Sequence, residues 1–385
     1  MCAGHFFDHL FMLVFATAVA LGLSAEWGMT YSELIPYATP GFIAFGVCAV
    51  PAGWLADKWS RKGMMVLFFV GIGLSSILAS FANSPLHISI GLLAIGVFAS
   101  IYHPVGISLV VQGRTNTGVP LAINGVFGNM GVAWAALVTG YLIDHSGWRS
   151  AFVFPGAASV VCGIAYTGFI YAGRNDDAET EVNRSKTNET DIVDRRLVGR
   201  VFAIVFASTA LGGLIFQSTT FTLPKIFDER LAELAVSAEV VGWYAFIVFT
   251  FAAIGQLVVG YLLDRYSVRV VFSGVALLQA VLFGIMPGLS GVSVLLIATA
   301  FMLAVFGQIP INDVLISRVA RSEWRSRAYA FRYIVTFSVS ASSLPVIAWI
   351  HSGWGFDSLF LVLSAAAALI LAVVLMLPGT IEGRG

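Results

Sequence analysis

Long apolar segments constrain the fold of this chain more than any other feature. A helix needs about 20 consecutive apolar residues to cross the roughly 30 Å of a bilayer's hydrocarbon core. Twelve such segments follow one another in the sequence. They are Leu10–Ala25, Leu34–Ala56, Met64–Ala82, Ile88–Val111, Val119–Ile143, Ala151–Ala172, Val201–Leu223, Val240–Leu263, Val270–Leu289, Val292–Ile316, Ala328–Ile350 and Phe356–Leu377. The pattern predicts an all-α membrane protein with twelve transmembrane helices.

The first apolar segment has an alternative explanation. Leu23-Ser24-Ala25 places small residues where a signal peptide could be cleaved. Removal of this segment would break the internal repeat described below. We therefore expect it to remain as the first membrane helix.

Composition and charge narrow the class of protein. Of 385 residues, 58% are hydrophobic and only 11% are charged, whereas about a quarter of a soluble domain is charged. The 21 basic and 21 acidic residues balance, so no electrostatic argument favours a nucleic-acid partner, and none is expected. The expected surroundings are a lipid bilayer.

Lys and Arg are unevenly distributed between alternate loops. If the N-terminus is cytoplasmic, every second loop is cytoplasmic, and 18 of the 21 Lys and Arg lie on that side. Only Arg149, Lys225 and Arg230 fall on the other side. Because cytoplasmic loops retain positive charge, we predict that both termini are cytoplasmic, in a bacterial-type inner membrane.

Two sequence motifs occur twice. The segment Gly53–Lys62 (Gly-Trp-Leu-Ala-Asp-Lys-Trp-Ser-Arg-Lys) is matched by Gly260–Arg269 (Gly-Tyr-Leu-Leu-Asp-Arg-Tyr-Ser-Val-Arg), 207 residues later. His145–Trp148 returns unchanged as His351–Trp354 after 206 residues. Repeats at nearly one spacing indicate that two halves of the chain share a fold.

A polar segment separates the two halves. Residues 174–200 are rich in Asp, Glu, Asn, Thr and Arg, so they are predicted to form a cytoplasmic linker. The chain then divides into an N-terminal six-helix bundle over 1–173 and a C-terminal six-helix bundle over 201–378. A short tail over 379–385 follows.

These motifs resemble those of a known family. Gly53-x-Leu55-Ala56-Asp57-x-x-x-Arg61-Lys62 resembles the signature loop of the major facilitator superfamily (MFS), and the Gly-Trp-Arg-x-x-Phe sequence over 147–152 is similar to its fifth-to-sixth hairpin. The resemblance covers essentially the whole chain. It implies the MFS fold and a secondary transporter that works by alternating access.

Within the superfamily, two segments resemble fosmidomycin-resistance-like exporters, namely His5–Asp8 and Tyr102–Pro104. The stretch Gly125–Gly131 has the glycines of the drug/proton antiporter motif but not its proline, which argues against a multidrug transporter. The resemblance implies proton-coupled export of a small organic molecule. Two alternatives remain: uptake or exchange of a small organic anion bound by Arg332, and an MFS-like receptor or assembly protein that does not transport.

Enzymatic activity is not expected from this sequence. It contains no Gly-x-x-x-x-Gly-Lys phosphate loop and no Cys or His pairs like those of zinc fingers. We therefore expect no cofactor and no metal. The expected partners are a small-molecule substrate and protons, and the expected state is a monomer.

The repeated loops contain the predicted gating residues. In the family, the aspartate of the first loop faces the start of the eleventh helix, where a positive helix end and nearby bases hold the cytoplasmic side closed. The same charges could instead serve only to set the topology. The predicted gating residues are Asp57, Lys58, Arg61 and Lys62 in the first loop, and Asp264, Arg265 and Arg269 in the second.

Ionisable side chains within apolar segments indicate function, because they are costly in hydrocarbon. His103 lies in the fourth segment beside Pro104, and we expect it to carry protons. A carbonyl released by the proline could instead satisfy this histidine. Asp313 lies close to the equivalent place in the tenth segment, near Pro310. It could carry a proton, contact the substrate or bond a neighbouring helix.

Other polar residues allow two explanations each. His5, Asp8 and His9 share one face of the first segment, where they could line a cavity or cap the helix. Arg332 could snorkel to the cytoplasm or bind an anion. Uncharged side chains could orient a substrate or bond other helices. These are Asn124, Asn129, Gln217, Gln256, Gln308 and Asn312.

Overall fold

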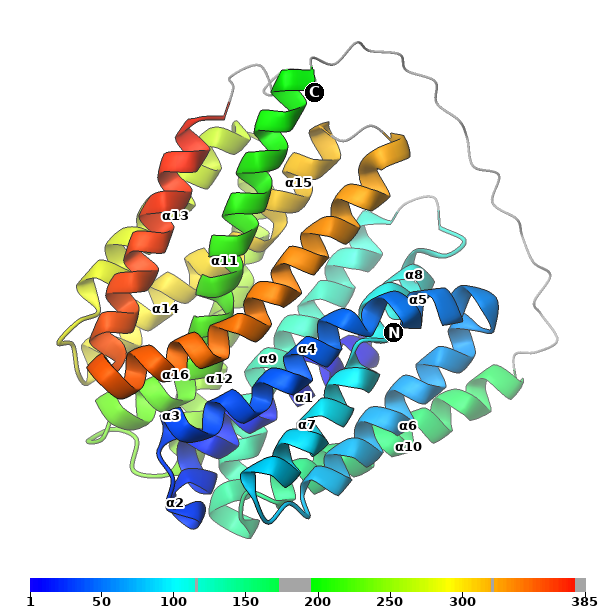
Figure 1. Ribbon diagram of the computed structural model, residues 1–385, viewed down its shortest axis with the longest axis vertical. Coiled ribbons are helices and arrows are strands. Elements are labelled where there is room, and N and C mark those ends of the chain that lie inside the picture. The colour runs from blue at the N-terminus through cyan, green and yellow to red at the C-terminus, as the bar shows by residue number, and fades with distance from the viewer. Residues whose placement is uncertain (115–116, 173–194, 320–321, 378–385) are drawn as a thin grey trace.

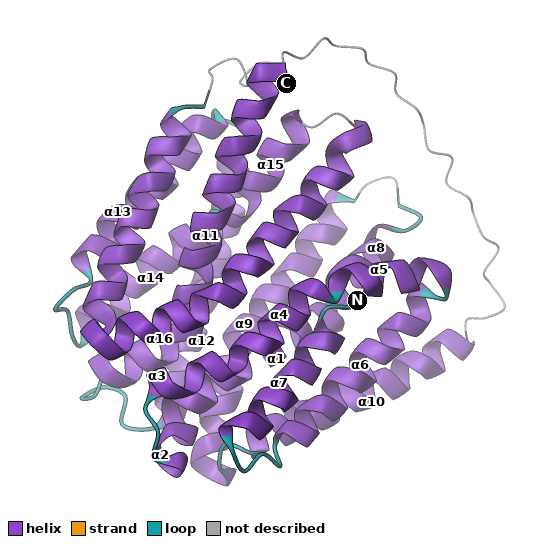
Figure 2. Ribbon diagram, in the orientation of Figure 1, coloured by secondary structure: helices purple, strands orange, loops and turns teal. Residues whose placement is uncertain are grey.

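A computed structural model describes residues 1–114, 117–172, 195–319 and 322–377. These residues form helices joined by short loops and contain no strand (Figure 2). The predicted tail over 379–385 and most of the predicted linker lie outside the described residues. The linker's last residues, from Arg195 onward, form the beginning of a helix.

Six crossings make up the N-terminal half. Their elements, in chain order, are α1 (Cys2–Ala18), η1 (Val19–Leu23) and α2 (Ser24–Trp27); α3 (Tyr31–Leu34), η2 (Ile35–Ala38), α4 (Thr39–Val47) and α5 (Ala49–Lys58); α6 (Arg61–Ala79); α7 (Pro85–Ala99), η3 (Tyr102–Gly106) and α8 (Ile107–Val111); α9 (Gly118–Ser146); and α10 (Ser150–Ala172). The first crossing consists of α1, η1 and α2, the second of α3, η2, α4 and α5, and the fourth of α7, η3 and α8; the other three crossings are single helices.

The C-terminal half repeats this arrangement. Its elements are α11 (Arg195–Arg230), α12 (Ala238–Leu263), α13 (Val268–Ile285), α14 (Val292–Gly307) with α15 (Ile309–Val319), and α16 (Ser322–Leu375). Among the described residues, eleven helices are long and apolar enough to span a membrane. The last, Ile334–Leu375, has 42 residues and is interrupted at Gly355, so it crosses twice. The predicted twelve crossings in two bundles are confirmed.

Serine residues set where several crossings begin. The Ser60 hydroxyl accepts a hydrogen bond from the Gly63 amide (3.0 Å), and Ser267 accepts one from Val270 (3.2 Å) at the equivalent turn of the second half. Such caps satisfy amides that have no partner inside the helix. The repeated serine therefore starts the third and ninth crossings in the same way.

The repeated His-Ser-Gly-Trp motif does not turn at the same residue in both halves. Gly147 ends α9 with φ 78°, a left-handed conformation that glycine adopts readily. In the second half the helix continues through Gly353, and the left-handed residue is Gly355, with φ 71°. The sequence repeat thus fixes the presence of the turn, and its position shifts by two residues.

Proline interrupts the fourth and tenth crossings at matching places. The π-helical turn η3 contains Pro104, and Gln308 separates α14 from α15 just before Pro310. Proline has no amide hydrogen and clashes with the preceding turn, so each helix departs from regular geometry there. Broken helices of this kind are tolerated at membrane depth where they border a cavity.

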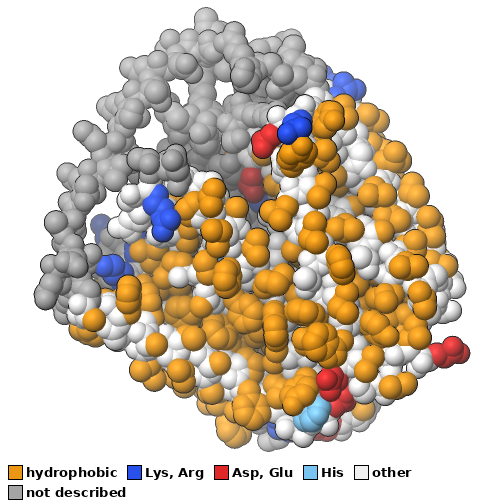
Figure 3. Space-filling view, turned by 180° about the vertical axis from the view of Figure 1, so that it is seen from behind, with side chains coloured by type: hydrophobic (Ala, Val, Ile, Leu, Met, Phe, Trp, Pro, Cys, Tyr) orange, Lys and Arg blue, Asp and Glu red, His pale blue; other side chains and the backbone are white. Residues whose placement is uncertain are grey.

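The two halves lie side by side, as Figure 1 shows. We call the end with the α5–α6 and α12–α13 turns the basic end, because Lys58, Arg61, Arg265 and Arg269 lie there; the opposite end, with the turns at Gly147 and Gly355, is the far end. Figure 3 shows that hydrophobic side chains cover most of one face between these ends. Such a surface suits contact with lipid, and the protein is an integral membrane protein.

The two halves approach each other closely where α9 crosses α12. A Cβ atom added to Gly140 would lie 2.2 Å from the Ala238 carbonyl oxygen, and one on Gly242 would lie 2.7 Å from that of Ala136. Only glycine permits this approach, which is typical of membrane helices that pack through small residues. The contact lies toward the far end, where both helices connect to their outer turns.

Candidate functional site

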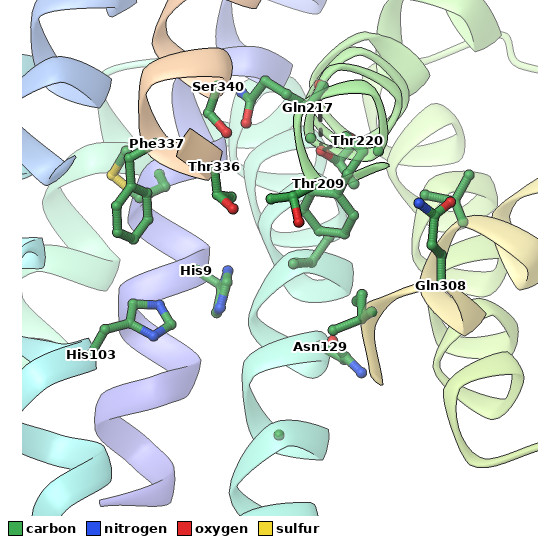
Figure 4. Close-up of a pocket in the computed structure, with 18 of the residues that line it drawn as sticks. His9, His103, Asn129, Thr209, Gln217, Thr220, Gln308, Thr336, Phe337 and Ser340 are labelled. Atoms are coloured by element: carbon green, nitrogen blue, oxygen red, sulfur yellow. Dashed lines mark hydrogen bonds between the residues drawn. The ribbon is translucent and has the colours of Figure 1, made fainter. Parts of the chain in front are cut away.

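A cavity of about 330 Å³ lies between the two halves. It is bordered by the first, second, fourth and fifth crossings of the N-terminal half and by the seventh, eighth, tenth and eleventh of the other. Figure 4 shows His9 and His103 on one side of it, and Asn129, Thr209 and Gln308 on the other. Residues of both halves of the repeat therefore line the cavity.

The structure brings nine of the eleven predicted cavity residues to this surface. These are His9, His103, Asn129, Gln217, Gln256, Gln308, Asn312, Asp313 and Arg332. The other two, Asp8 and Asn124, are buried behind the wall. Asn124 donates a hydrogen bond to the Tyr102 hydroxyl (2.7 Å), so it joins the fifth crossing to the fourth.

Arg332 and Asp313 form an ion pair at the wall of the C-terminal half. The Arg332 side chain is 12% exposed and that of Asp313 is 41% exposed. Arg332 thus points toward the cavity rather than to the basic end. Partly buried charges are stabilised when paired, and removing one partner leaves the other uncompensated.

Histidines and one carboxylate form a cluster in the N-terminal half. His5 and His9, one turn apart on α1, approach within 3.2 Å through their Nε2 atoms. The Nε2 atom of His103 lies 3.3 Å from the Asp8 carboxylate, which is fully buried. Only the regular spacing within α1 was visible in the sequence. The approach of His103 depends on the packing of η3 against α1.

Uncharged polar residues mostly bond other helices. Asn129 donates to Gln256 (2.7 Å) and so links the fifth crossing to the eighth across the halves. Gln279 donates to the Gln308 side chain (2.9 Å). Among the six predicted residues of this kind, Gln217 keeps its buried amide nitrogen without a hydrogen-bond partner among the described residues.

Glycines of the fifth crossing divide between packing and the cavity. A Cβ atom on Gly131 would lie 2.2 Å from the Phe6 carbonyl oxygen, and one on Gly128 would lie 2.6 Å from the His5 ring. Both allow α1 to approach α9. Gly125 meets nothing within 4 Å and lines the cavity.

Several lining residues were not predicted from the sequence. They are Thr209, Thr220, Thr336 and Ser340, together with four phenylalanines, Phe42, Phe45, Phe216 and Phe337. His5 also lines the cavity; its spacing on α1 singled it out but left open whether it faces a cavity or caps the helix. Hydroxyl and aromatic side chains are common in membrane helices, so nothing in the sequence distinguished these from residues that face lipid.

The predicted gating residues lie at the basic end, at the two equivalent turns. Asp57 pairs with Arg61 of its own half (2.7 Å), and both side chains are exposed. Lys58 and Lys62 are exposed beside them.

The equivalent turn of the second half has a similar arrangement. There Asp264 is exposed, and Arg265 stacks on the Tyr261 ring at 4.1 Å. Arg269 is half-buried at the start of α13. Asp57 thus makes its ion pair within the N-terminal half.

Polar contacts join the halves at the far end. The Ser32 hydroxyl and His351 Nδ1 lie 2.7 Å apart. Asp144 accepts hydrogen bonds from the backbone amides of Ala238 (3.3 Å) and Glu239 (2.7 Å). Toward the basic end, Figure 1 shows α15 and the first turns of α16 separated from α5 and α8. The halves therefore meet at the far end, and at the basic end these backbone segments of the two halves lie apart.

Comparison with known proteins gives the family. The family model of the Major Facilitator Superfamily matches residues 1–232 and 226–383. The chain is 23% identical over 277 residues to the gallate transporter of Pseudomonas putida, covering 64% of this chain and 61% of that protein. It is 23% identical over 397 residues to the 4-hydroxybenzoate transporter PcaK of the same organism, covering 93% and 87%.

Other relatives are matched over shorter stretches. The cis,cis-muconate transport protein of Acinetobacter baylyi is 27% identical over 160 residues, which is 41% of this chain and 39% of that protein. Several of these alignments, including that with the gallate transporter, therefore span less than two thirds of the relative's length.

Solved structures show the same fold. A POT family transporter in complex with 5-aminolevulinic acid superimposes with a TM-score of 0.73 at 13% sequence identity, covering 99% of this chain and 96% of the other. A D-xylose-proton symporter gives a TM-score of 0.71 at 13% identity, covering 100% and 98%. With the family model matched along almost its entire length, the chain belongs to the Major Facilitator Superfamily.

Proposed function

We propose that the protein is a secondary transporter that carries a small organic carboxylate across the membrane by alternating access. The observation that supports this most directly is Arg332. Among the described residues that line the cavity, it is the only lysine or arginine. Its planar guanidinium suits two-point binding of a carboxylate.

The rest of the cavity suits a small organic acid. A volume of about 330 Å³ lies within the usual range for small-molecule sites. Phe45 and Phe337 pack at 4.9 Å between ring centres and provide apolar surface beside the polar groups. Relatives named as transporters of gallate, cis,cis-muconate, 4-hydroxybenzoate and niacin have carboxylic acids as their named substrates.

Asp313 provides a route for proton coupling. A substrate carboxylate that binds Arg332 competes with Asp313 for the same guanidinium. Leaving Asp313 charged and unpaired in the cavity costs free energy, and protonation removes that cost. Binding of the anion and uptake of a proton by Asp313 then favour each other. His103 remains a second predicted proton carrier. Coupling of this kind drives uptake under an inward proton gradient, whereas the export direction implied by the exporter resemblance, which remains a prediction, would require proton and substrate to bind in alternation.

Alternating access follows from the two ends of the molecule. In this conformation the far end is held by contacts between the halves, and at the basic end the backbones of α15 and the first turns of α16 lie apart from α5 and α8. The positive-inside rule assigns the basic end to the cytoplasm of a bacterial-type inner membrane. Rocking of the bundles would close the basic end, where Asp57 and its neighbours lie, and open the far end. One chain contains the whole cavity, so a monomer suffices.

Transport by proteoliposomes tests the proposal. We expect counterflow of labelled 4-hydroxybenzoate by the wild type, loss of at least about 30-fold in Arg332→Gln, and partial activity in Arg332→Lys. The expected loss follows from the cost of truncating one partner of a buried charge pair, which is roughly 2–5 kcal/mol, and the lower value corresponds to about 30-fold. Arg200→Gln, which changes an exposed arginine at the start of α11, is the matched control. Unchanged anion flux in Arg332→Gln would reject the proposal, and vesicles of known orientation report the direction.

A further inference from the structure

We propose that His5, His9 and His103 form a binding site for one divalent transition-metal ion, such as Zn²⁺, in the cavity wall. One ring nitrogen from each histidine lies within 4.8 Å of the other two. Zinc binds imidazole nitrogens at about 2.0–2.1 Å in tetrahedral geometry, which separates neighbouring nitrogens by roughly 3.4 Å. The 3.2 Å between the Nε2 atoms of His5 and His9 is close to this value.

The hydrogen bonds of His5 orient it as a ligand. Its Nδ1 atom lies 2.8 Å from the Asn124 backbone carbonyl oxygen, which can only accept a hydrogen bond. Nδ1 therefore carries the hydrogen, and the Nε2 lone pair faces His9. Histidines that bind metals are commonly held in this way by a carbonyl or carboxylate on the other ring nitrogen.

Asp8 supplies an independent indication of a cation. Its side chain is fully buried, and the polar side chain that meets it is His103. The contact that its oxygen makes with His103 Nε2, at 3.3 Å, is that of a carboxylate behind a metal-binding histidine. A carboxylate in this position would orient His103 so that its other ring nitrogen is available to a metal ion.

The site would keep one coordination position toward the cavity. All three histidines line the cavity, and Figure 4 shows the rings of His9 and His103 at its edge. Three protein ligands with an open fourth position are the arrangement of reactive zinc sites, whereas structural sites have four. The fourth ligand would be water or an anion from the cavity. This site lies in the N-terminal half and does not depend on Arg332 or on the proposed substrate.

Metal titration of the purified full chain tests the inference. The protein is prepared with a tag that contains no histidine, stripped with EDTA, and titrated with Zn²⁺ by calorimetry. We expect one ion per chain in the wild type, and at least about 100-fold weaker binding in His9→Asn. Asp8→Asn should weaken binding by about 10–100-fold, the usual effect of changing a residue behind a ligand. His87→Asn, at an exposed histidine of α7, is the matched control and should bind as the wild type.

Thermal unfolding separates loss of the site from loss of the fold. Saturating Zn²⁺ should raise the Tm of the wild type and of His87→Asn, but not that of a folded His9→Asn variant. Equal Zn²⁺ binding by wild type and His9→Asn, or no binding by the wild type, would overturn the inference. If the wild type binds no Zn²⁺, the close approach of His5 and His9 would reflect only a hydrogen bond between the two rings.

Discussion

Arg332 begins the eleventh crossing, where the sequence allowed it either to reach the basic end or to face inward. The structure turns its side chain toward the cavity and pairs it with Asp313 of the tenth crossing. Snorkelling requires an unobstructed path for the charged head to water, whereas an inward carboxylate offers a partner at lower cost. At the residue scale, the identity of the neighbour decides which role an arginine takes.

Asp313→Asn tests the coupling role of this pair. The amide imitates a permanently protonated carboxyl group, so Arg332 stays available to the substrate but no proton is taken up or released. We expect counterflow close to that of the wild type and no accumulation of 4-hydroxybenzoate driven by a pH gradient. Both are measured in the same proteoliposomes. Gradient-driven accumulation by the variant would show that protons are carried elsewhere, and His103 would then be the next residue to change.

At the scale of elements, the contact of α9 with α12 holds the far end together. Backbone atoms approach so closely there that no side chain fits at Gly140 or Gly242. Membrane helices have no hydrophobic force between them, so they associate through close packing of this kind. The elements broken at Pro104 and Pro310 contribute differently, because they direct His103 and Asp313 to the cavity.

Gly242→Val tests the importance of the helix contact. The added side chain would meet the Ala136 carbonyl oxygen, and overpacking typically costs about 1–3 kcal/mol. We expect a lower Tm for the solubilised protein and slower transport, because the far end cannot close fully. Gly274→Val is the matched control, since nothing lies within 4 Å of a Cβ atom there. Equal destabilisation of both variants would contradict this account.

At the scale of the whole molecule, the two ends differ in how the halves meet. The far end is joined by polar contacts such as that of Ser32 with His351, and at the basic end the backbones of α15 and α5 lie apart. Alternating access requires the far-end contacts to break in every cycle. They therefore have to be individually weak and collectively sufficient to hold one state.

Cross-linking at the far end tests this requirement. In a background with Cys2, Cys48 and Cys162 changed to serine, Ser32→Cys and His351→Cys place two thiols at the contact. A short reducible thiol cross-linker should abolish transport by the double variant, and reduction should restore it. Each single variant, treated in the same way, should remain active. Continued transport by the fully cross-linked protein would show that the far end does not open during the cycle.

The sequence by itself determined the twelve crossings and their division into two repeated bundles. Hydrophobic length fixes the number of crossings because a bilayer has a fixed thickness and every backbone polar group in it has to be paired within the helix. His103 and Asp313 are also distinguished by sequence alone, because each lies near a proline within an apolar segment, where an ionisable group is costly.

Only the tertiary structure decided which polar residues share a surface. Helical periodicity relates His5 to His9, but the approach of His103 and the pairing of Arg332 with Asp313 depend on how separate helices pack. In a membrane, lipid and protein interior are equally apolar, so the sequence pattern of a helix does not reveal which face meets a neighbour. Asn124, which was expected in the cavity, is hydrogen-bonded behind its wall, and Thr336, which was not predicted, lines the cavity.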